Sequence, residues 1–135
     1  MCIGECEVNY YGLYRATEDL NIWITPTNEN IKCIFDTMLS MGYTESEFEE
    51  IKNEDFTTYF ICSIGARPNI IDVLTILHHT LNFDEAQKYM VSHKVNNDLK
   101  LKMVSYKTFK DSKLPSRQPM DFEDISRLEK LRTDL

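Results

Sequence analysis

The sequence predicts an α/β fold of the α+β kind, in which helices flank one mixed β-sheet. Segments rich in β-branched and aromatic residues alternate along the chain with segments whose apolar residues recur at helical spacing. The length of 135 residues fits a single domain, 1–135, without repeats, low-complexity tracts or an interdomain linker. The hydrophobic content of 42% and the charged content of 27% are ordinary for a globular protein.

The first part of the chain contains two predicted strands and three predicted helices. In chain order, we expect a strand at 1–3, a short helix at 5–11, a strand at 20–24, a helix at 28–41 and a short helix after 44. Asn28 is a favoured N-cap residue, and Gly42 stands where a helix C-terminus favours glycine. Thr44 and Glu47 have the spacing of a capping box.

The second part continues the alternation. We expect strands at 57–64 and 70–77 joined by a turn at 65–69, a helix at 83–90 after Asn82, a strand at 99–104, a helix at 105–114 capped by Ser105, and a last helix at 120–132. The last helix is acidic at its start and basic at its end, which suits the helix dipole. Its apolar face is predicted to carry Phe122, Ile125, Leu128 and Leu131.

Charge, hydropathy and cysteine spacing exclude several classes of protein. A formal net charge of -7 argues against an extended surface for binding nucleic acid. No apolar run is long enough to span a membrane, and the first residues do not form a signal peptide, so we expect a cytoplasmic protein. The cysteines lack zinc-site spacing and are expected to be free thiols: Cys2, Cys6, Cys33 and Cys62.

Polar residues within two of the predicted strands are candidates for chemistry. Asp19 and Asn21 lie two positions apart at the start of a strand, so their side chains share one face. Asp72 stands within an apolar run, where a carboxylate is costly to bury unless it is paired or binds a metal ion. Oxygen ligands from two adjacent strands suit Mg²⁺. His78 and His79 lack a carboxylate at metal-ligand spacing, so we expect ordinary solvated or core histidines.

Residues 11–24 read Tyr-Gly-Leu-Tyr-Arg-Ala-Thr-Glu-Asp-Leu-Asn-Ile-Trp-Ile, which resembles the signature of nucleotidyltransferase-fold proteins. The chain is similar to a small bacterial group of that superfamily, which includes toxins of abortive-infection systems and uncharacterised relatives. Its pattern is a strand ending in Gly-Gly or Gly-Ser, a helix, and Arg-x-Thr-x-Asp-Leu-Asp on a strand. A later carboxylate matches Asp72, and the tail 105–131 resembles the family's ending. The resemblance covers nearly the whole chain.

The resemblance implies a Mg²⁺-dependent transfer of a nucleoside monophosphate from a nucleoside triphosphate to a hydroxyl acceptor. In the family, carboxylates bind two Mg²⁺ ions, a hydroxyl attacks the α-phosphate, and pyrophosphate leaves. Asp19 and Asp72 would be the catalytic residues, and together with Asn21 they would form the metal site.

The resemblance also implies where the nucleotide would bind. Gly4 would be the glycine of the phosphate turn, and Arg15 and Thr17 would shape the entrance and steady the loop. Lys113 and Arg117 match a Lys and an Arg of the family's tail and would contact phosphate. The alternative for these two residues is an ordinary solvated surface.

The chain departs from the family pattern in three ways. Asn21 replaces a carboxylate, and its amide oxygen lacks the negative charge that holds a divalent ion. Glu5 replaces a small residue at the start of a helix, where its carboxylate would repel a triphosphate. Fewer residues precede Gly4 than in the family, so we expect a fold truncated at its N-terminus.

These departures leave two functions open. The chain is either a weakened nucleotidyltransferase or a catalytically inactive relative that binds a nucleotide or a partner. The short N-terminus predicts exposed apolar surface at Ile3, Val8 and Tyr11 and on the face of the sheet behind Trp23, and therefore a homodimer or a cognate partner protein. In the alternative, the last helix folds back and covers this surface within one chain.

Overall fold

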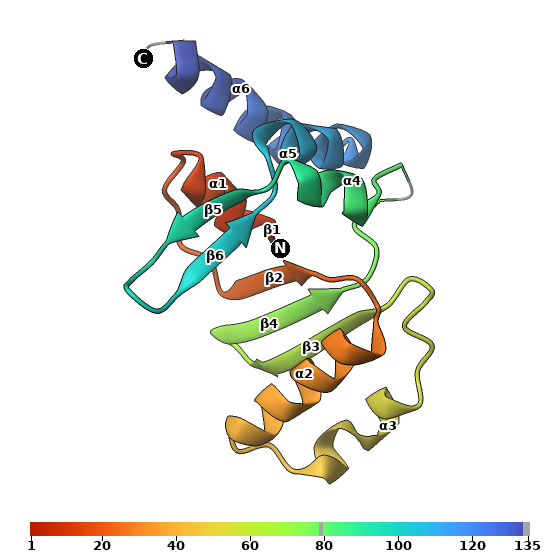
Figure 1. The fold of residues 1–135 in the computed structure, drawn as a ribbon. Coiled ribbons are helices and arrows are strands. Elements are labelled where there is room, and N and C mark those ends of the chain that lie inside the picture. The colour runs from red at the N-terminus through yellow and green to blue at the C-terminus, as the bar shows by residue number, and fades with distance from the viewer. Residues whose placement is uncertain (79, 134–135) are drawn as a thin grey trace.

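A computed structural model describes residues 1–78 and 80–133 of the protein. It shows one mixed β-sheet flanked by helices (Figure 1). This confirms the predicted α+β class. The six strands are β1 (Cys2–Ile3), β2 (Asp19–Trp23), β3 (Ile61–Ala66), β4 (Asn69–Leu74), β5 (Val91–Lys94) and β6 (Lys100–Met103). Their order in the sheet is β3-β4-β2-β1-β6-β5. The β2–β4 and β1–β6 pairs are parallel, and the other pairs are antiparallel.

The helices divide between two sides of the sheet. They are α1 (Glu5–Tyr10), α2 (Asn28–Ser40), α3 (Glu49–Lys52), α4 (Phe83–Lys88), α5 (Tyr106–Lys113) and α6 (Pro119–Thr133), with 3-10 turns at Glu45–Phe48 and Leu114–Ser116. In Figure 1, α2 and α3 lie over β3 and β4, whereas α1, α4, α5 and α6 gather at the other end of the molecule.

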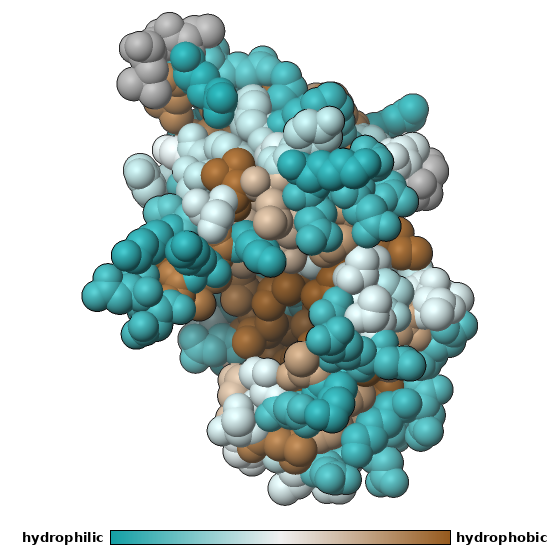
Figure 2. Space-filling view, viewed as in Figure 1, coloured by the Kyte–Doolittle hydropathy of each residue, from teal (hydrophilic) through white to brown (hydrophobic). Residues whose placement is uncertain are grey.

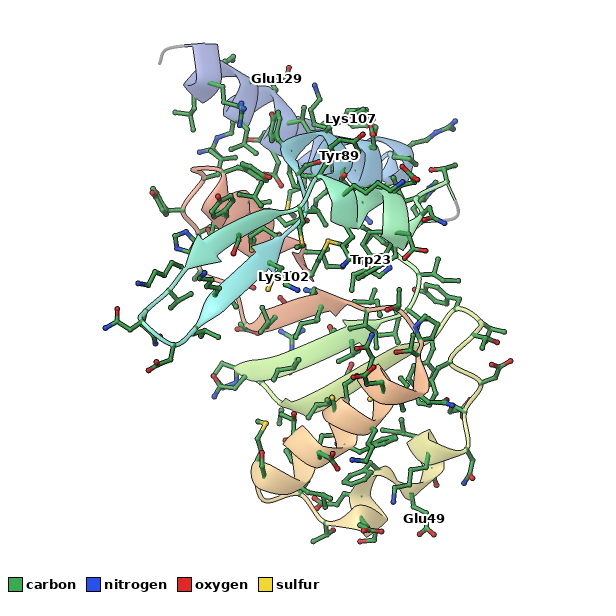
Figure 3. All side chains as sticks on the ribbon, viewed as in Figure 1. Trp23, Glu49, Tyr89, Lys102, Lys107 and Glu129 are labelled. Atoms are coloured by element: carbon green, nitrogen blue, oxygen red, sulfur yellow. The ribbon has the colours of Figure 1, made fainter. Side chains whose placement is uncertain are left out.

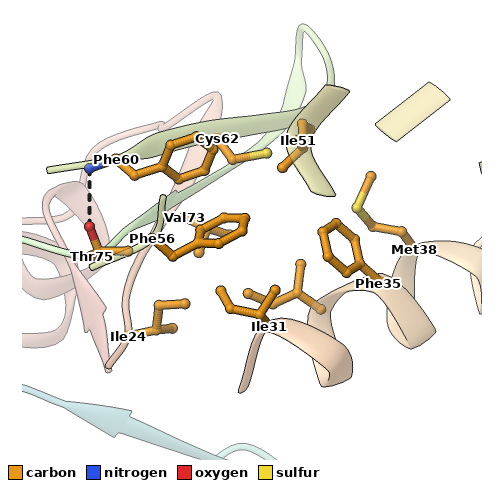
Figure 4. Close-up of a pocket in the computed structure, with 11 residues that line it drawn as sticks. Ile24, Ile31, Phe35, Met38, Ile51, Phe56, Phe60, Cys62, Val73 and Thr75 are labelled. Atoms are coloured by element: carbon orange, nitrogen blue, oxygen red, sulfur yellow. Dashed lines mark hydrogen bonds between the residues drawn. The ribbon is translucent and has the colours of Figure 1, made fainter. Parts of the chain in front are cut away.

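Each side of the sheet has its own hydrophobic core, because neighbouring residues of a strand point to opposite faces. Trp23 belongs to the first core, with Ile3 and residues of α1, α4, α5 and α6. Val73 belongs to the second core, with Met38 of α2 and Phe48. Figure 4 shows this second core, where the Phe60 amide donates to the Thr75 hydroxyl at 3.0 Å.

Most of the predicted N-cap residues are confirmed by the hydrogen bonds that their side chains make. Asn82 and Ser105 accept hydrogen bonds from the first turns of α4 and α5, and Thr44 begins a capping box with Glu47. The exception is α2, where Thr27 rather than Asn28 is the N-cap and accepts the Asn30 amide at 3.2 Å. Asn28 is instead the first residue of the helix.

Two strand predictions are corrected. The sequence predicts a strand from Thr57, but β3 begins at Ile61, and residues 57 and 58 form a turn closed by Asp55. The strand β5 is not predicted, because Ser92, His93 and Lys94 lack an apolar alternation. Backbone pairing with β6 holds it in the sheet.

The predicted apolar face of the last helix is only half right. Ile125 and Leu128 are buried, but Phe122 and Leu131 are 48% and 43% exposed. Asp121 and Asp124 are buried in their place. The helix takes this rotation because both carboxylates pair with cations of the neighbouring elements.

The predicted exposure of the N-terminal apolar residues is wrong. Ile3 is 3% exposed and Val8 is 0% exposed. Ile125 and Leu128 of α6 lie in the same core cluster, so the last helix covers these residues within one chain. Tyr11 packs against this cluster and donates its hydroxyl to the Val104 carbonyl at 2.6 Å. Among the helices of residues 1–78 and 80–133, none combines the length and apolar character needed to cross a membrane.

Candidate functional site

The three predicted metal ligands lie on one face of the sheet. Asn21 of β2 stands beside Asp72 of β4 in the parallel register, so the two side chains share a face. Asp19 lies two positions before Asn21 and therefore has the same orientation. This face is the one that carries Trp23 and the first core. The structure thus brings two carboxylates and an amide to one side of adjacent strands.

Gly4 connects the start of α1 to this face. It has a φ of 73°, which favours glycine, and it is the N-cap residue of α1. A Cβ atom at this position would lie 3.2 Å from the Asn21 Nδ2 atom. A larger residue would therefore displace Asn21 as well as strain the backbone. The predicted phosphate turn and the predicted metal ligand therefore lie side by side at one cleft.

A cleft of about 340 Å³ opens beside these two residues. It is lined by Ile3, Gly4, Glu5, Glu7, Asp19, Asn21, Leu74, Leu77, Ser112, Lys113 and Asp121. Four of these residues are Asp or Glu and one is Lys, so acidic side chains outnumber basic ones in the cleft. An acidic cleft disfavours a triphosphate unless cations accompany it.

Asp72 lies outside this cleft, whereas Thr17 contacts one of its lining residues, Asp19. Asp72 accepts a hydrogen bond of 2.5 Å from Ser63 of β3. Thr17 donates its hydroxyl to the Asp19 carboxylate at 2.8 Å and therefore steadies that carboxylate. Arg15, Thr17 and Asp19 line a second cleft, which shares Glu5 and Asp19 with the first.

Glu7 is the residue of the cleft that the sequence does not predict. Its side chain is 1% exposed, and its Oε2 atom accepts the Gly4 amide at 2.7 Å. The Oε1 atom is also buried and has no hydrogen-bond partner among the described residues. Burial raises the pKa of Glu7 to about 8, against the opposing effects of the Gly4 amide and the Lys113 charge. The available signal was a Glu at the third position of a helix, where a capping box has one.

Arg15 ties three elements together. Its guanidinium donates to both oxygens of Asp124 in α6, at 3.0 Å and 2.8 Å, and to Glu5 Oε1 in α1 at 2.6 Å. The Asn9 side chain holds the Arg15 backbone through two further hydrogen bonds. Asp124 is 2% exposed and the Arg15 side chain is 29% exposed, so the ion pair is buried on the Asp124 side only. Arg15 therefore neutralises the charge of the Glu5 carboxylate. The Gly4 amide donates its hydrogen bond to Glu7 and not to Glu5.

The two predicted phosphate contacts of the tail are separated. Lys113 lines the cleft, but its ammonium donates to Asp121 at 2.7 Å, and Ser116 donates to the other oxygen of Asp121. Arg117 is exposed in a left-handed turn with a φ of 53° and does not line the cleft. The geometry therefore places Lys113, but not Arg117, beside the candidate site.

The residues present do not fit the two-metal site that the resemblance implies. No group of three His, Cys, Asp or Glu side chains within residues 1–78 and 80–133 lies close enough to hold a metal ion. Asn21 contributes no charge, and Asp72 lies outside the cleft. The four cysteines are free, as expected. His78 contacts the Thr80 hydroxyl, and His79 lies outside the described residues.

No protein-family model, curated protein or solved structure matches this chain.

Proposed function

We propose that this chain is a nucleotidyltransferase-like protein that acts as a nucleotide- or partner-binding module, with its transfer activity weakened or lost. The observation that carries the proposal is the juxtaposition of Gly4 and Asn21. The amide of Gly4 already binds the Glu7 carboxylate, and Asn21 supplies a neutral oxygen where the pattern has a carboxylate. Both features reduce the affinity for a Mg²⁺–triphosphate complex.

The second candidate function is the transfer itself. It is supported by Asp19, Asn21 and Asp72, which share one face of two adjacent strands. Thr17 would orient Asp19 toward the cleft, whereas Asp72 lies outside the cleft and accepts a hydrogen bond from Ser63. A rate far below that of an intact three-carboxylate site is expected.

Thermal unfolding with Mg²⁺ and each of ATP, CTP, GTP and UTP tests nucleotide binding, because a ligand that binds only the folded state raises the melting temperature. We expect at least one triphosphate to raise it in the native chain and to lose this effect in Asp19→Asn. The matched control is Asp98→Asn, which removes an exposed charge from the β5–β6 turn. Absence of any rise would contradict nucleotide binding.

Incubation with α-labelled triphosphates then separates the two candidate functions. A binding module leaves the label in the free nucleotide. Label that becomes covalently attached to an acceptor, and that is lost in Asp72→Asn but not in Asp98→Asn, would establish transfer instead.

A further inference from the structure

The α2 side of the sheet carries an apolar groove that is separate from the acidic cleft. Figure 2 shows it as a hollowed brown area between the β5–β6 hairpin and α2. The groove measures about 310 Å³ and is lined by Ile22, Ile24, Asn30, Cys33, Ile34, Thr37, Met38, Met41, Ile64, Ile71 and Val73. The strand residues Ile22, Ile24 and Ile71 are only partly covered, and Met41 at the end of α2 is exposed.

The two sides of this groove carry opposite charges. In α2 the charged residues are Glu29, Lys32 and Asp36, and Lys32 pairs with Asp36 at 3.1 Å, so α2 has an excess of one negative charge. Residues 45–55, which follow α2, add six Asp and Glu residues against Lys52. The β5–β6 hairpin, residues 91–103, contains three Lys against one Asp. Figure 3 shows Lys102 on β6, beside the centre of the molecule. Lys94, Lys100 and Lys102 are exposed and form no ion pair with the described residues.

We propose that a second copy of this chain binds at the groove and forms a homodimer with twofold symmetry. A twofold axis through the apolar strip would place the basic hairpin of each copy against the acidic α2 of the other. An isologous interface needs such a self-complementary surface, and here one surface holds both charge signs on either side of an apolar strip. This occupant is favoured over an unlike protein, because a wholly acidic or wholly basic partner would match only one of the two sides.

Of the two surfaces that the sequence predicts to be exposed, the N-terminal one is buried, whereas the groove lies on the other, the face of the sheet behind Trp23. Ile3 and Val8 are covered by the chain's own α6, whereas no helix of residues 1–78 or 80–133 lies over the groove between α2 and the hairpin. Contiguous apolar surface of this kind, bordered by charged residues, is typical of an interaction site.

Charge reversal tests the proposal without altering the buried core. The first variant, Lys100→Glu with Lys102→Glu, makes the hairpin acidic. The second, Glu29→Lys with Asp36→Lys, makes the exposed side of α2 basic. The matched control is Lys107→Glu, because Lys107 lies on α5, away from the groove (Figure 3). Molar mass is measured by light scattering at several protein concentrations, and circular dichroism confirms that each variant is folded.

We expect the native chain and the Lys107→Glu variant to have the mass of a dimer and each charge-reversed variant to have the mass of a monomer. An equimolar mixture of the two charge-reversed variants should recover the dimer, because each acidic hairpin then meets a basic α2 and each native hairpin meets a native α2. A native chain that stays monomeric at every concentration would overturn the proposal. A dimer that persists in both variants would also overturn it, because the interface would lie elsewhere.

Discussion

The two sides of the sheet differ in whether their charged side chains are paired within the chain. On the side of α1, α5 and α6, the buried charges are paired inside the chain: Arg15 with Asp124 and Glu5, and Lys113 with Asp121. On the side of α2, Lys32 and Lys52 pair with Asp36 and Glu45, but the hairpin lysines make no ion pair with the described residues, and they border an apolar groove. The first side is therefore complete within one chain, and its charges stabilise the fold. The second side has charges and apolar surface that remain available to a partner.

The largest expected effect comes from breaking the internal pairing. Asp124→Ala removes the buried partner of Arg15, which keeps its ion pair with Glu5, and we expect the free energy of unfolding to fall by about 1.5 kcal/mol. Urea denaturation measures it. The control Glu123→Ala removes the neighbouring, exposed carboxylate of α6 and should change stability by less than about 0.5 kcal/mol. Equal losses in both variants would contradict a special role for the Arg15–Asp124 pair.

The buried Glu7 predicts a pH dependence on the same side of the sheet. Its pKa is about 8 in the folded chain against 4.5 as the ordinary value, so the folded state holds a proton that the unfolded state releases. The Glu7 contribution to stability is therefore present below pH 4.5 and is lost as the pH rises through 8. The slope should not exceed about 1.4 kcal/mol per pH unit.

Urea denaturation between these two pH values tests the Glu7 prediction. The Glu7→Gln variant, which has no titrating group at this position, should lose less stability over that range than the native chain. The exposed Glu123→Gln variant serves as the control and should follow the native chain. Parallel pH profiles of the native chain and Glu7→Gln would show that Glu7 is ionised in both states.

The α2 side offers a smaller and purely local test. Thr27→Ala removes the N-cap hydroxyl of α2 and should cost about 1 kcal/mol, whereas Asn28→Ala should be nearly neutral. Thermal or urea unfolding of the two variants measures the difference. The reverse order would restore Asn28 as the cap and contradict the position at which α2 begins.

The features that the sequence could predict depend on local pattern. Residues 20–24 were recognisable as a strand by their β-branched and aromatic content, and Asn82 and Ser105 as caps by their spacing. The features that it could not predict depend on distant partners. Arg15 and Asp124 are 109 positions apart, so periodicity alone placed Phe122 inside rather than Asp124.

The candidate site shows the same division. That Asp19 and Asn21 share a face followed from the two-residue period of a strand, and the pairing with β4 then brings Asp72 beside Asn21. The burial of Glu7 could not be read from residues 5–11, because it depends on the packing of α1 against elements that are distant in the sequence. The pairing of Lys113 with Asp121 likewise needs the relative positions of α5 and α6.

The most direct test of the account is a calorimetric titration of Mg²⁺ into the native chain and into Asn21→Asp. The proposal is that the neutral side chain of Asn21 weakens cation binding on the face that carries Asp19 and Asp72. We expect Asn21→Asp to bind Mg²⁺ more tightly than the native chain, because it adds a charged oxygen beside Asp19 and Asp72. The control Asn97→Asp adds the same charge to the β5–β6 turn and should give no gain. Equal affinity in Asn21→Asp and the native chain would contradict a metal site at this position.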